Sequence, residues 1–68
     1  MQLFYAPDIR PPQYTLSEEE SKHCVRVLRL ACGDTVHLTD GRGTLYRCEI
    51  TDDNPRRCGV RVVSAGGG

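Results

Sequence analysis

The chain lacks several features of larger, secreted or membrane proteins. Its 68 residues include no tryptophan and one phenylalanine, so the core has to come mostly from Val, Leu, Ile, Tyr and Cys. A domain of this length buries only about 60% of the surface that its unfolded chain exposes. No apolar run approaches the ~20 residues of a membrane span, and the N-terminus lacks the charged start and apolar stretch of a signal peptide. We therefore expect one soluble, cytoplasmic domain with no membrane partner.

Motifs for catalysis and cofactor binding are also missing. The sequence contains no G-x-S-x-G, no P-loop and no G-x-G-x-x-G. Cys24 follows His23 directly, but neighbours on a helix point about 100° apart, so the two do not form a catalytic dyad. The glutamates at 18–20 are explained by the positive end of a helix dipole rather than by acid–base chemistry. We expect no catalytic residue in this chain.

The cysteines do not fit a metal site or a disulfide framework. Cys24, Cys32, Cys48 and Cys58 include no C-x-x-C pair, and their spacings are not those of a zinc ribbon. Without a signal peptide the compartment is expected to be reducing. We therefore expect free, buried cysteines that act as small hydrophobic residues, and no metal.

Charge is balanced overall but unevenly distributed. Nine basic residues meet nine acidic ones, and eight of the nine basic residues are arginine. Five acids fall in two clusters, Glu18–Glu20 and Asp52–Asp53, which leaves nine basic residues against four acids elsewhere. The planar guanidinium suits phosphate and stacks on bases. Codon preference in a high-GC genome explains the same excess of arginine, and composition alone does not decide between the two.

The first half of the chain predicts a strand and then a helix. A strand is expected over Gln2–Ala6, followed by a proline-rich connector. Ser17 and Glu20 form a capping box that begins a helix, and Gly33 is expected to end it as a left-handed cap. The buried stripe of this helix is predicted to contain Cys24, Val27 and Leu28.

The second half changes to a period of two, which predicts a three-stranded meander. The buried faces of its strands are expected to be Val36 and Leu38; then Tyr46, Cys48 and Ile50; then Cys58, Val60 and Val62. The connecting turns are Asp40–Gly43 and Asp52–Pro55. Residues 1–65 are thus expected to form one mainly β domain, a small antiparallel barrel capped by one helix. Residues 66–68 are expected to be a flexible glycine tail.

Basic residues at spacings of three are the strongest functional signal. His23, Arg26 and Arg29 are expected on one side of the helix, with Arg42 in a turn and Arg47 on an outward strand face; Arg57 and Arg61 also face outward. Together they predict a surface for an RNA backbone. The alternative is a solvated face balanced by nearby glutamates. Stacking platforms are expected to be sparse, because most of the aromatic residues should be in the core.

Residues 23–50 carry a resemblance to a known family. The motifs H-x-x-R-V-L-R-L, G-D, V-x-L-x-D-G-R-G and Y-x-x-E-I resemble the N-terminal domain of RsmE-type ribosomal RNA methyltransferases. The opening strand with Phe4-Tyr5 and the L-S-E-E-E segment before the histidine are similar too. The resemblance covers nearly all of residues 1–63.

The resemblance implies a PUA-like β-barrel that helps to bind 16S rRNA of the small ribosomal subunit. In this family a C-terminal knotted SPOUT domain, which is dimeric, binds S-adenosylmethionine, and the enzyme methylates N3 of a uracil. His23, Arg26 and Arg29 match the H-x-x-R-V-L-R motif, while Asp40, Gly41 and Gly43 match the turn. The parent is then expected to be a homodimer.

The sequence departs from the family pattern because no SPOUT domain follows. This chain alone is therefore expected to bind RNA, to hold no cofactor and to lack methyltransferase activity. Two other interpretations remain open at this point. The chain is a packing module for a catalytic domain, or it is a stand-alone small RNA-binding protein.

Overall fold

The structure is a computed structural model that describes residues 3–67. Gln2 and Gly68, which belong to the predicted first strand and tail, lie outside the described residues. The elements follow one another as β1 (Leu3–Tyr5), β2 (Gln13–Thr15), α1 (Glu18–Lys22), a π-helical turn η1 (His23–Val27), β3 (Thr35–Thr39), β4 (Thr44–Asp53) and β5 (Cys58–Gly67).

All five strands belong to one sheet, in the order β1-β3-β4-β5-β2. The predicted meander is confirmed, since β3, β4 and β5 pair antiparallel with their neighbours in sequence. The prediction of an entirely antiparallel sheet is wrong, because β1 runs parallel to β3. Parallel neighbours need a crossover connection, and here the chain passes through β2 and the helix before it returns to β1 as β3.

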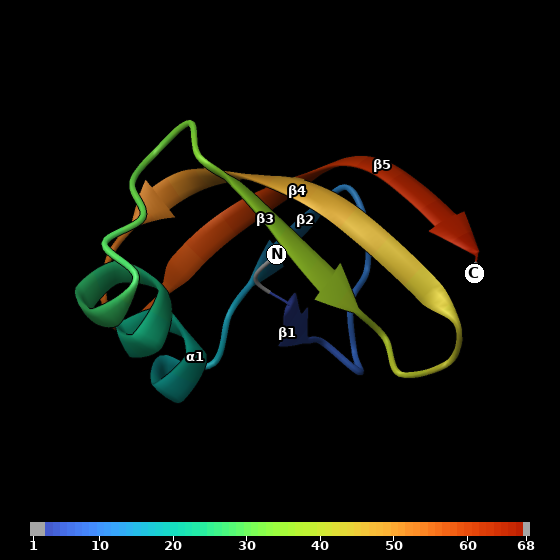
Figure 1. The fold of residues 1–68 in the computed structure, drawn as a ribbon, viewed down its shortest axis with the longest axis horizontal. Helices are drawn as coiled ribbons and strands as arrows, with labels where there is room; N and C mark the ends of the chain where they lie inside the picture. The colour runs from blue at the N-terminus through green and yellow to red at the C-terminus, as the bar shows by residue number, and fades with distance from the viewer. Residues whose placement is uncertain (1–2, 68) are drawn as a thin grey trace.

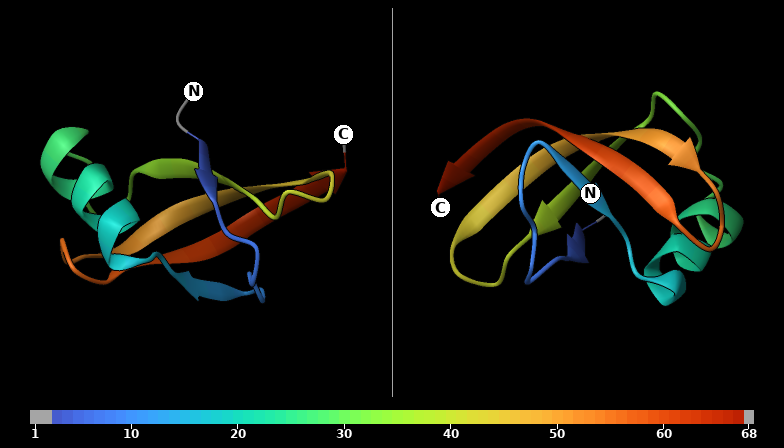
Figure 2. Two further views of the ribbon diagram at one scale, coloured as in Figure 1. Left: turned by 90° about the horizontal axis from the view of Figure 1, so that it is seen from below. Right: turned by 180° about the vertical axis from the view of Figure 1, so that it is seen from behind.

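The sheet curls into a half-barrel, with the helix at one end (Figures 1 and 2). Its two edges, β1 and β2, are consecutive in the chain and are joined by the connector 6–12. This arrangement confirms the predicted fold class, a mainly β domain that resembles a small barrel capped by a helix.

The core lies on the concave side of the sheet. It combines aliphatic side chains from β3, β4 and β5 with Phe4 of β1 and Leu16, which precedes the helix. Cys24, Cys48 and Cys58 are fully buried and free, which confirms the prediction for these three thiols. Cys32 is exposed, so the prediction is wrong for that residue.

The helix begins where the capping pattern predicts. Ser17 Oγ accepts a hydrogen bond from the backbone N–H of Glu20 at 3.2 Å. The reciprocal bond of a capping box is not formed among the described residues, and Glu20 Oε2 is buried without a hydrogen-bond partner there. Ser17 is therefore the effective cap.

The helix ends earlier than predicted, and its second half is π-helical. The N–H of Leu28 donates to the carbonyl of His23 at 3.0 Å, which is the i to i−5 pattern of a π-turn. The left-handed residue after it is Arg29, with φ 57°, and not Gly33. Gly33 lies four residues further along the chain. Its N–H donates to the carbonyl of Ile50 in β4, so it contacts the sheet and does not cap the helix.

The wider turn also changes which side chains are buried. Cys24 is fully buried and Leu28 packs at the edge of the core, as predicted. Val27 is 64% exposed, so its predicted place in the buried stripe is wrong. The reason is that the i to i−5 bonding of a π-turn widens the turn, so the residue three positions after Cys24 moves off the buried side while Leu28, four positions after it, stays near it.

Strand β5 continues further than predicted. Its last residues pair with the first half of β4, from Arg47 opposite Ser64 to Thr44 opposite Gly67. Gly66 and Gly67, which were expected to start the tail, therefore belong to the sheet. The partner is the first part of the ten-residue β4, whose residues 45–47 pair with β3 on one side and with the end of β5 on the other.

Candidate nucleic-acid interface

The three basic residues expected on the helix lie at its irregular end. His23 and Arg26 are in η1, Arg29 follows it, and all three are exposed. They do not share one side of a regular helix as predicted, because Arg29 sits in the left-handed conformation beyond the last turn. Positive charge is favourable here, since the carbonyl end of a helix carries partial negative charge.

His23 also has a packing contact. Its ring lies 6.2 Å from the ring of Phe4, measured between centroids, in an edge-to-face arrangement at 72°. Phe4 is buried in the core, so His23 covers the sheet while it remains exposed on its other side. A role in RNA binding would thus be combined with a structural one.

The other two predicted residues lie elsewhere. Arg42 is in the turn between β3 and β4, at the end of the sheet opposite the helix (Figure 1). Arg47 is in β4, opposite His37 of β3 and Ser64 of β5, and is exposed on the outer face. The structure therefore does not join the five predicted residues into one patch.

The turn that carries Arg42 is shaped by an aspartate. Asp40 Oδ1 accepts the N–H of Arg42 at 2.7 Å and that of Thr44 at 3.3 Å. These bonds favour the charged carboxylate, chiefly the one from Arg42, and hold the pKa of Asp40 below its usual value. Gly41 and Gly43 both have positive φ, as the turn pattern predicts.

Two further arginines lie in the turn between β4 and β5, which meets the helix at Cys58. The buried hydroxyl of Ser21 donates to the carbonyl of Leu16 at 3.2 Å and accepts the N–H of Cys58 at 2.8 Å. Arg56 and Arg57, directly before Cys58, are exposed. No spacing pattern in the sequence indicates Arg56, because only the contact between Ser21 and Cys58, 37 residues apart, brings this turn to the helix.

Arg61, which was expected to face outward, is occupied by an ion pair. Its guanidinium lies 3.4 Å from a carboxylate oxygen of Glu49, and both side chains are about half exposed. Exposed ion pairs of this kind contribute little to stability. The pair nevertheless cancels the positive charge of Arg61 locally.

The buried thiols are chemically quiet. The sulfur atoms of Cys24 and Cys58 are 4.0 Å apart. Burial raises the pKa of the Cys58 thiol to about 12 and also raises that of Cys24. Because the thiolate is the nucleophile, neither residue is suited to catalysis. Among residues 3–67, no three His, Cys, Asp or Glu side chains gather as metal ligands.

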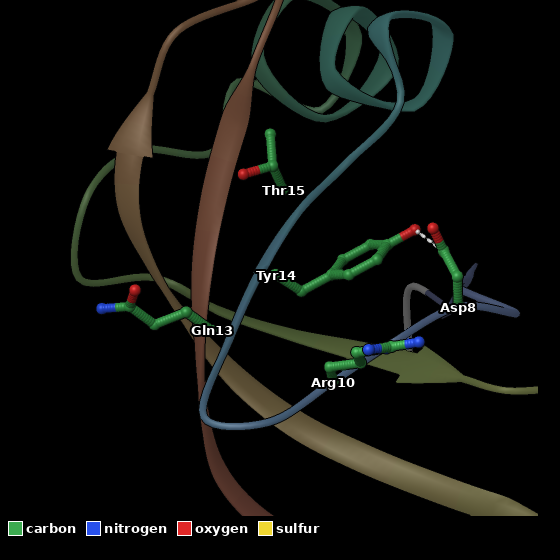
Figure 3. Close-up of a pocket in the computed structure, with 5 residues that line it drawn as sticks. All are labelled: Asp8, Arg10, Gln13, Tyr14 and Thr15. Atoms are coloured by element: carbon green, nitrogen blue, oxygen red, sulfur yellow. Dashed lines mark hydrogen bonds between the residues drawn. The ribbon is translucent and has the colours of Figure 1, made fainter.

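An open groove lies beside the edge strand β2. One part, of about 560 Å³, is lined by Asp8, Arg10, Gln13, Tyr14 and Thr15 (Figure 3). The hydroxyl of Tyr14 donates to Asp8 Oδ1 at 2.9 Å. Burial, followed by this hydrogen bond, raises the pKa of Tyr14 to about 12, so the hydroxyl remains a donor at neutral pH.

The groove continues into a second hollow of about 450 Å³. The two hollows share Asp8, Tyr14 and Thr15, and the second adds Tyr5 of β1 and Glu20 of α1. We call the combined feature the edge groove, because it runs between the two edge strands of the half-barrel. No helix in the described part of the chain is long and apolar enough to span a membrane.

Comparison with known proteins agrees with this geometry. The family described as the RNA methyltransferase PUA domain matches residues 16–63. A structure from Porphyromonas gingivalis, named a probable rRNA methyltransferase, is 38% identical with a TM-score of 0.89, and the match covers 100% of this chain and 28% of that one. No curated protein gave a significant match.

Two other solved structures have the same fold. A predicted RNA methyltransferase from Thermotoga maritima is 28% identical with a TM-score of 0.84, covering 98% of this chain and 31% of that one. Ribosomal RNA small subunit methyltransferase E from Neisseria gonorrhoeae, bound to S-adenosylmethionine, is 22% identical with a TM-score of 0.84, covering 97% and 28%. The chain thus spans about three tenths of the length of these structures.

Proposed function

Because the chain belongs to the RNA methyltransferase PUA domain family, we propose that it is the rRNA-recognition domain of a longer methyltransferase. The parent enzyme would use S-adenosylmethionine to methylate N3 of a uracil in 16S rRNA of the small subunit. Its catalytic SPOUT domain, its homodimer contact and its cytoplasmic location are parts of the same proposal. This chain would supply recognition and no catalytic residue.

The observation that carries the proposal is the irregular backbone under the exposed basic residues. A π-turn and a left-handed arginine are both uncommon, and a left-handed residue other than glycine costs about 1–2 kcal/mol. Such features concentrate at functional sites, where strain is retained for a purpose. Here they present Arg26 and Arg29 to solvent, and the arginine fork suits phosphate oxygens.

Arg42 and Arg47 would make a second set of contacts. They lie away from the helix, and the molecule is 29 Å long, so an RNA segment that reaches both sets has to follow its long axis. His23 would join the first set from its exposed side. Most of these contacts would be to phosphate, which fixes orientation more than it reads sequence.

The methyl donor is not expected to bind this chain. Its reactive group has to be shielded from water, whereas most of the side chains that line the edge groove are exposed. We therefore assign no residue here to S-adenosylmethionine and leave donor binding to the rest of the parent.

Salt dependence of RNA binding tests the proposal. If three or four phosphates are contacted, log K should fall against log salt with a slope of roughly −2 to −3 for a single strand. Fluorescence anisotropy with a labelled small-subunit rRNA fragment measures this. Arg26→Ala and Arg29→Ala should each reduce the slope by about 0.7, and the double variant by twice that.

Arg61→Ala is the matched control, because it removes the same charge from a residue that is paired with Glu49. It should leave affinity and slope nearly unchanged. A chain that binds without salt dependence, or an Arg26→Ala/Arg29→Ala variant that binds like the control, would rule out the proposed contact.

A packing role is the second candidate, and exposed apolar residues favour it. Leu3, Tyr5, Leu45 and Val63 are 39–58% exposed on strands of the sheet. Tyr5 and Leu45 both lie opposite Thr39, so three neighbouring strands place them in one row on the outer face. Amide exchange in this chain and in a longer parent would distinguish the roles. New protection at Leu45 and Val63 in the parent indicates packing there.

A further inference from the structure

The edge groove brings together groups that suit a single unpaired nucleotide. Tyr14 provides an aromatic face, Asp8 a carboxylate and Arg10 a guanidinium, all from the connector and β2 (Figure 3). The hollow around them, of about 560 Å³, is open to solvent at the surface. Nothing in the basic helix end offers a comparable flat surface, since its side chains are charged or aliphatic apart from His23.

Two tyrosines keep accessible ring surface, although most of the aromatic residues are in or against the core, as the sequence predicts. Tyr5 is 58% exposed, and Tyr14 is only half-buried. Both contribute to the edge groove, one from each edge of the half-barrel. The bond from its hydroxyl to Asp8 fixes the ring of Tyr14 before any ligand arrives. A preorganised aromatic face loses little conformational entropy on binding.

We propose that the edge groove binds one unpaired RNA nucleotide, with the base stacked on Tyr14, its donor edge at Asp8 and a neighbouring phosphate at Arg10. This inference rests on the proposed function and adds base recognition to it. Stacking on an aromatic side chain contributes roughly 5- to 150-fold in affinity per base. Single-stranded segments are where proteins read RNA bases, because their edges are free.

The carboxylate sets the base preference. Asp8 Oδ1 already accepts from Tyr14, and the remaining lone pairs of the carboxylate can only accept further hydrogen bonds. Guanine presents two adjacent donors, N1–H and N2–H, and cytosine presents an amino group. Uracil places carbonyl oxygens on both sides of its single N–H, where they meet the carboxylate unfavourably. The groove should thus prefer guanine, then cytosine, over uracil.

The same preference separates this nucleotide from the one that is methylated. A uracil is the proposed target of the parent enzyme, and a groove that disfavours uracil would hold a different position of the same RNA. The backbone around the groove is well fixed, since Val62 of β5 donates to the carbonyl of Pro12 at 2.7 Å. The groove would therefore hold the bound nucleotide at a fixed place relative to the sheet.

Binding of labelled pentanucleotides UUGUU, UUCUU and UUUUU, measured by fluorescence anisotropy, tests the groove. The wild-type chain should bind UUGUU most tightly and UUUUU least tightly. Tyr14→Leu should weaken UUGUU by roughly 5- to 150-fold. Tyr14→Phe retains the ring and should change the affinity less than about threefold. Arg10→Gln should weaken all three RNAs alike and reduce the salt slope by about 0.7.

Asp8→Asn provides a test that does not depend on Tyr14→Leu being folded. The amide keeps an acceptor for Tyr14 but adds donors, so the preference for UUGUU over UUUUU should disappear. Amide NMR spectra of each variant verify the fold and locate the shifts at 8–15. If Asp8→Asn keeps the preference, or folded Tyr14→Leu binds like the wild type, the groove proposal is overturned.

The outcomes also separate this inference from the proposed function. If the rRNA fragment binds and loses affinity in Arg26→Ala/Arg29→Ala, but groove variants have no effect, only the groove is wrong. If the wild-type chain binds neither the rRNA fragment nor any pentanucleotide, both proposals fail.

Discussion

The two ends of the sheet are built in different ways. At the hairpin end, the turn Asp40–Gly43 is closed by bonds within five residues, from Asp40 to Arg42 and Thr44. At the helix end, the backbone depends on partners far away in sequence: Ser21 meets Cys58, and Gly33 meets Ile50. One end therefore follows from local turn chemistry, while the other exists only once the sheet has formed.

The difference coincides with the distribution of candidate RNA contacts. The hairpin end offers Arg42 on a regular glycine turn, with no residue other than glycine at positive φ. The helix end offers His23, Arg26 and Arg29 on a π-turn followed by a left-handed arginine. Irregular backbone needs support from its surroundings, and the buried contacts of the helix end supply that support.

The largest effect is expected from breaking the support at the helix end. Ser21→Ala removes a buried hydroxyl and leaves the carbonyl of Leu16 and the N–H of Cys58 without their partner. Each unsatisfied buried group costs about 1–3 kcal/mol, so we expect a loss of about 3 kcal/mol in the free energy of unfolding. Urea unfolding followed by circular dichroism measures it. Ser64→Ala, at an exposed serine of β5, is the control and should change stability by less than about 0.5 kcal/mol.

A smaller effect is expected at the hairpin end, where two glycines can be compared directly. A Cβ at Gly41 would lie 2.7 Å from Cε1 of Tyr5, whereas a Cβ at Gly43 meets nothing within 4 Å. Both have positive φ, so alanine costs about 1–2 kcal/mol at either. Gly41→Ala should cost slightly more, by up to about 0.5 kcal/mol, because the ring of Tyr5 has to move aside, and this ring is exposed and free to do so. The excess should vanish in a Tyr5→Ala background, and equal losses there and in the wild type would show that the contact is unimportant.

The sequence predicts the fold well where bonds are local, as at the hairpin end, and poorly where contacts are long-range, as at the helix end. The alternating pattern and the D-G-R-G turn predict β3, β4 and the hairpin correctly, because both signals are local. Parallel pairing of β1 could not be predicted, since strand partners depend on the whole topology. The end of the helix was misplaced for a similar reason: Gly33 has the expected positive φ, but it bonds to Ile50 rather than ending a helix.

The candidate sites show the same division. The basic residues are predicted by their spacing, but their grouping is not, because the π-turn decides where Arg29 lies and the contact at the start of β5 decides where Arg56 lies. Most of the aromatic residues are in or against the core, as predicted: Phe4 is buried, and Tyr14 and Tyr46 are partly buried and pack against it. Tyr14 also lines the edge groove, and the exposed Tyr5 lines it from the other edge strand, which the sequence pattern could not show because the two edges approach each other only in the folded half-barrel.

A modest gain in stability is expected when the strained residue is replaced. Arg29→Gly removes the left-handed penalty and should raise the free energy of unfolding by up to about 1 kcal/mol. Arg26→Gly makes the same chemical change inside the helical turn and should lower it by about 1 kcal/mol. Both should weaken RNA binding. Thermal unfolding and anisotropy on the same samples separate the effects, and a destabilised Arg29→Gly would show that the arginine is not strained.

The two ends should also respond to opposite ends of the pH scale. The pKa of Cys58 is raised to about 12, so its contribution to stability is complete below about pH 9 and is lost as the pH rises toward 12. The pKa of Asp40 is lowered, so its contribution is present above its ordinary pKa and is lost as the pH falls through the folded value. Urea midpoints measured from pH 2 to 11 should fall at both limits.

Asp40→Asn should flatten the acid limb alone, because the amide still accepts the turn's hydrogen bonds but does not titrate. The alkaline limb should remain in Asp40→Asn, and Tyr14→Phe, which removes the other group with a pKa of about 12, should reduce it only in part. If the urea midpoint of Asp40→Asn no longer fell at either acid or alkaline pH, the assignment of the acid limb to Asp40 and of the alkaline limb to other groups would be wrong.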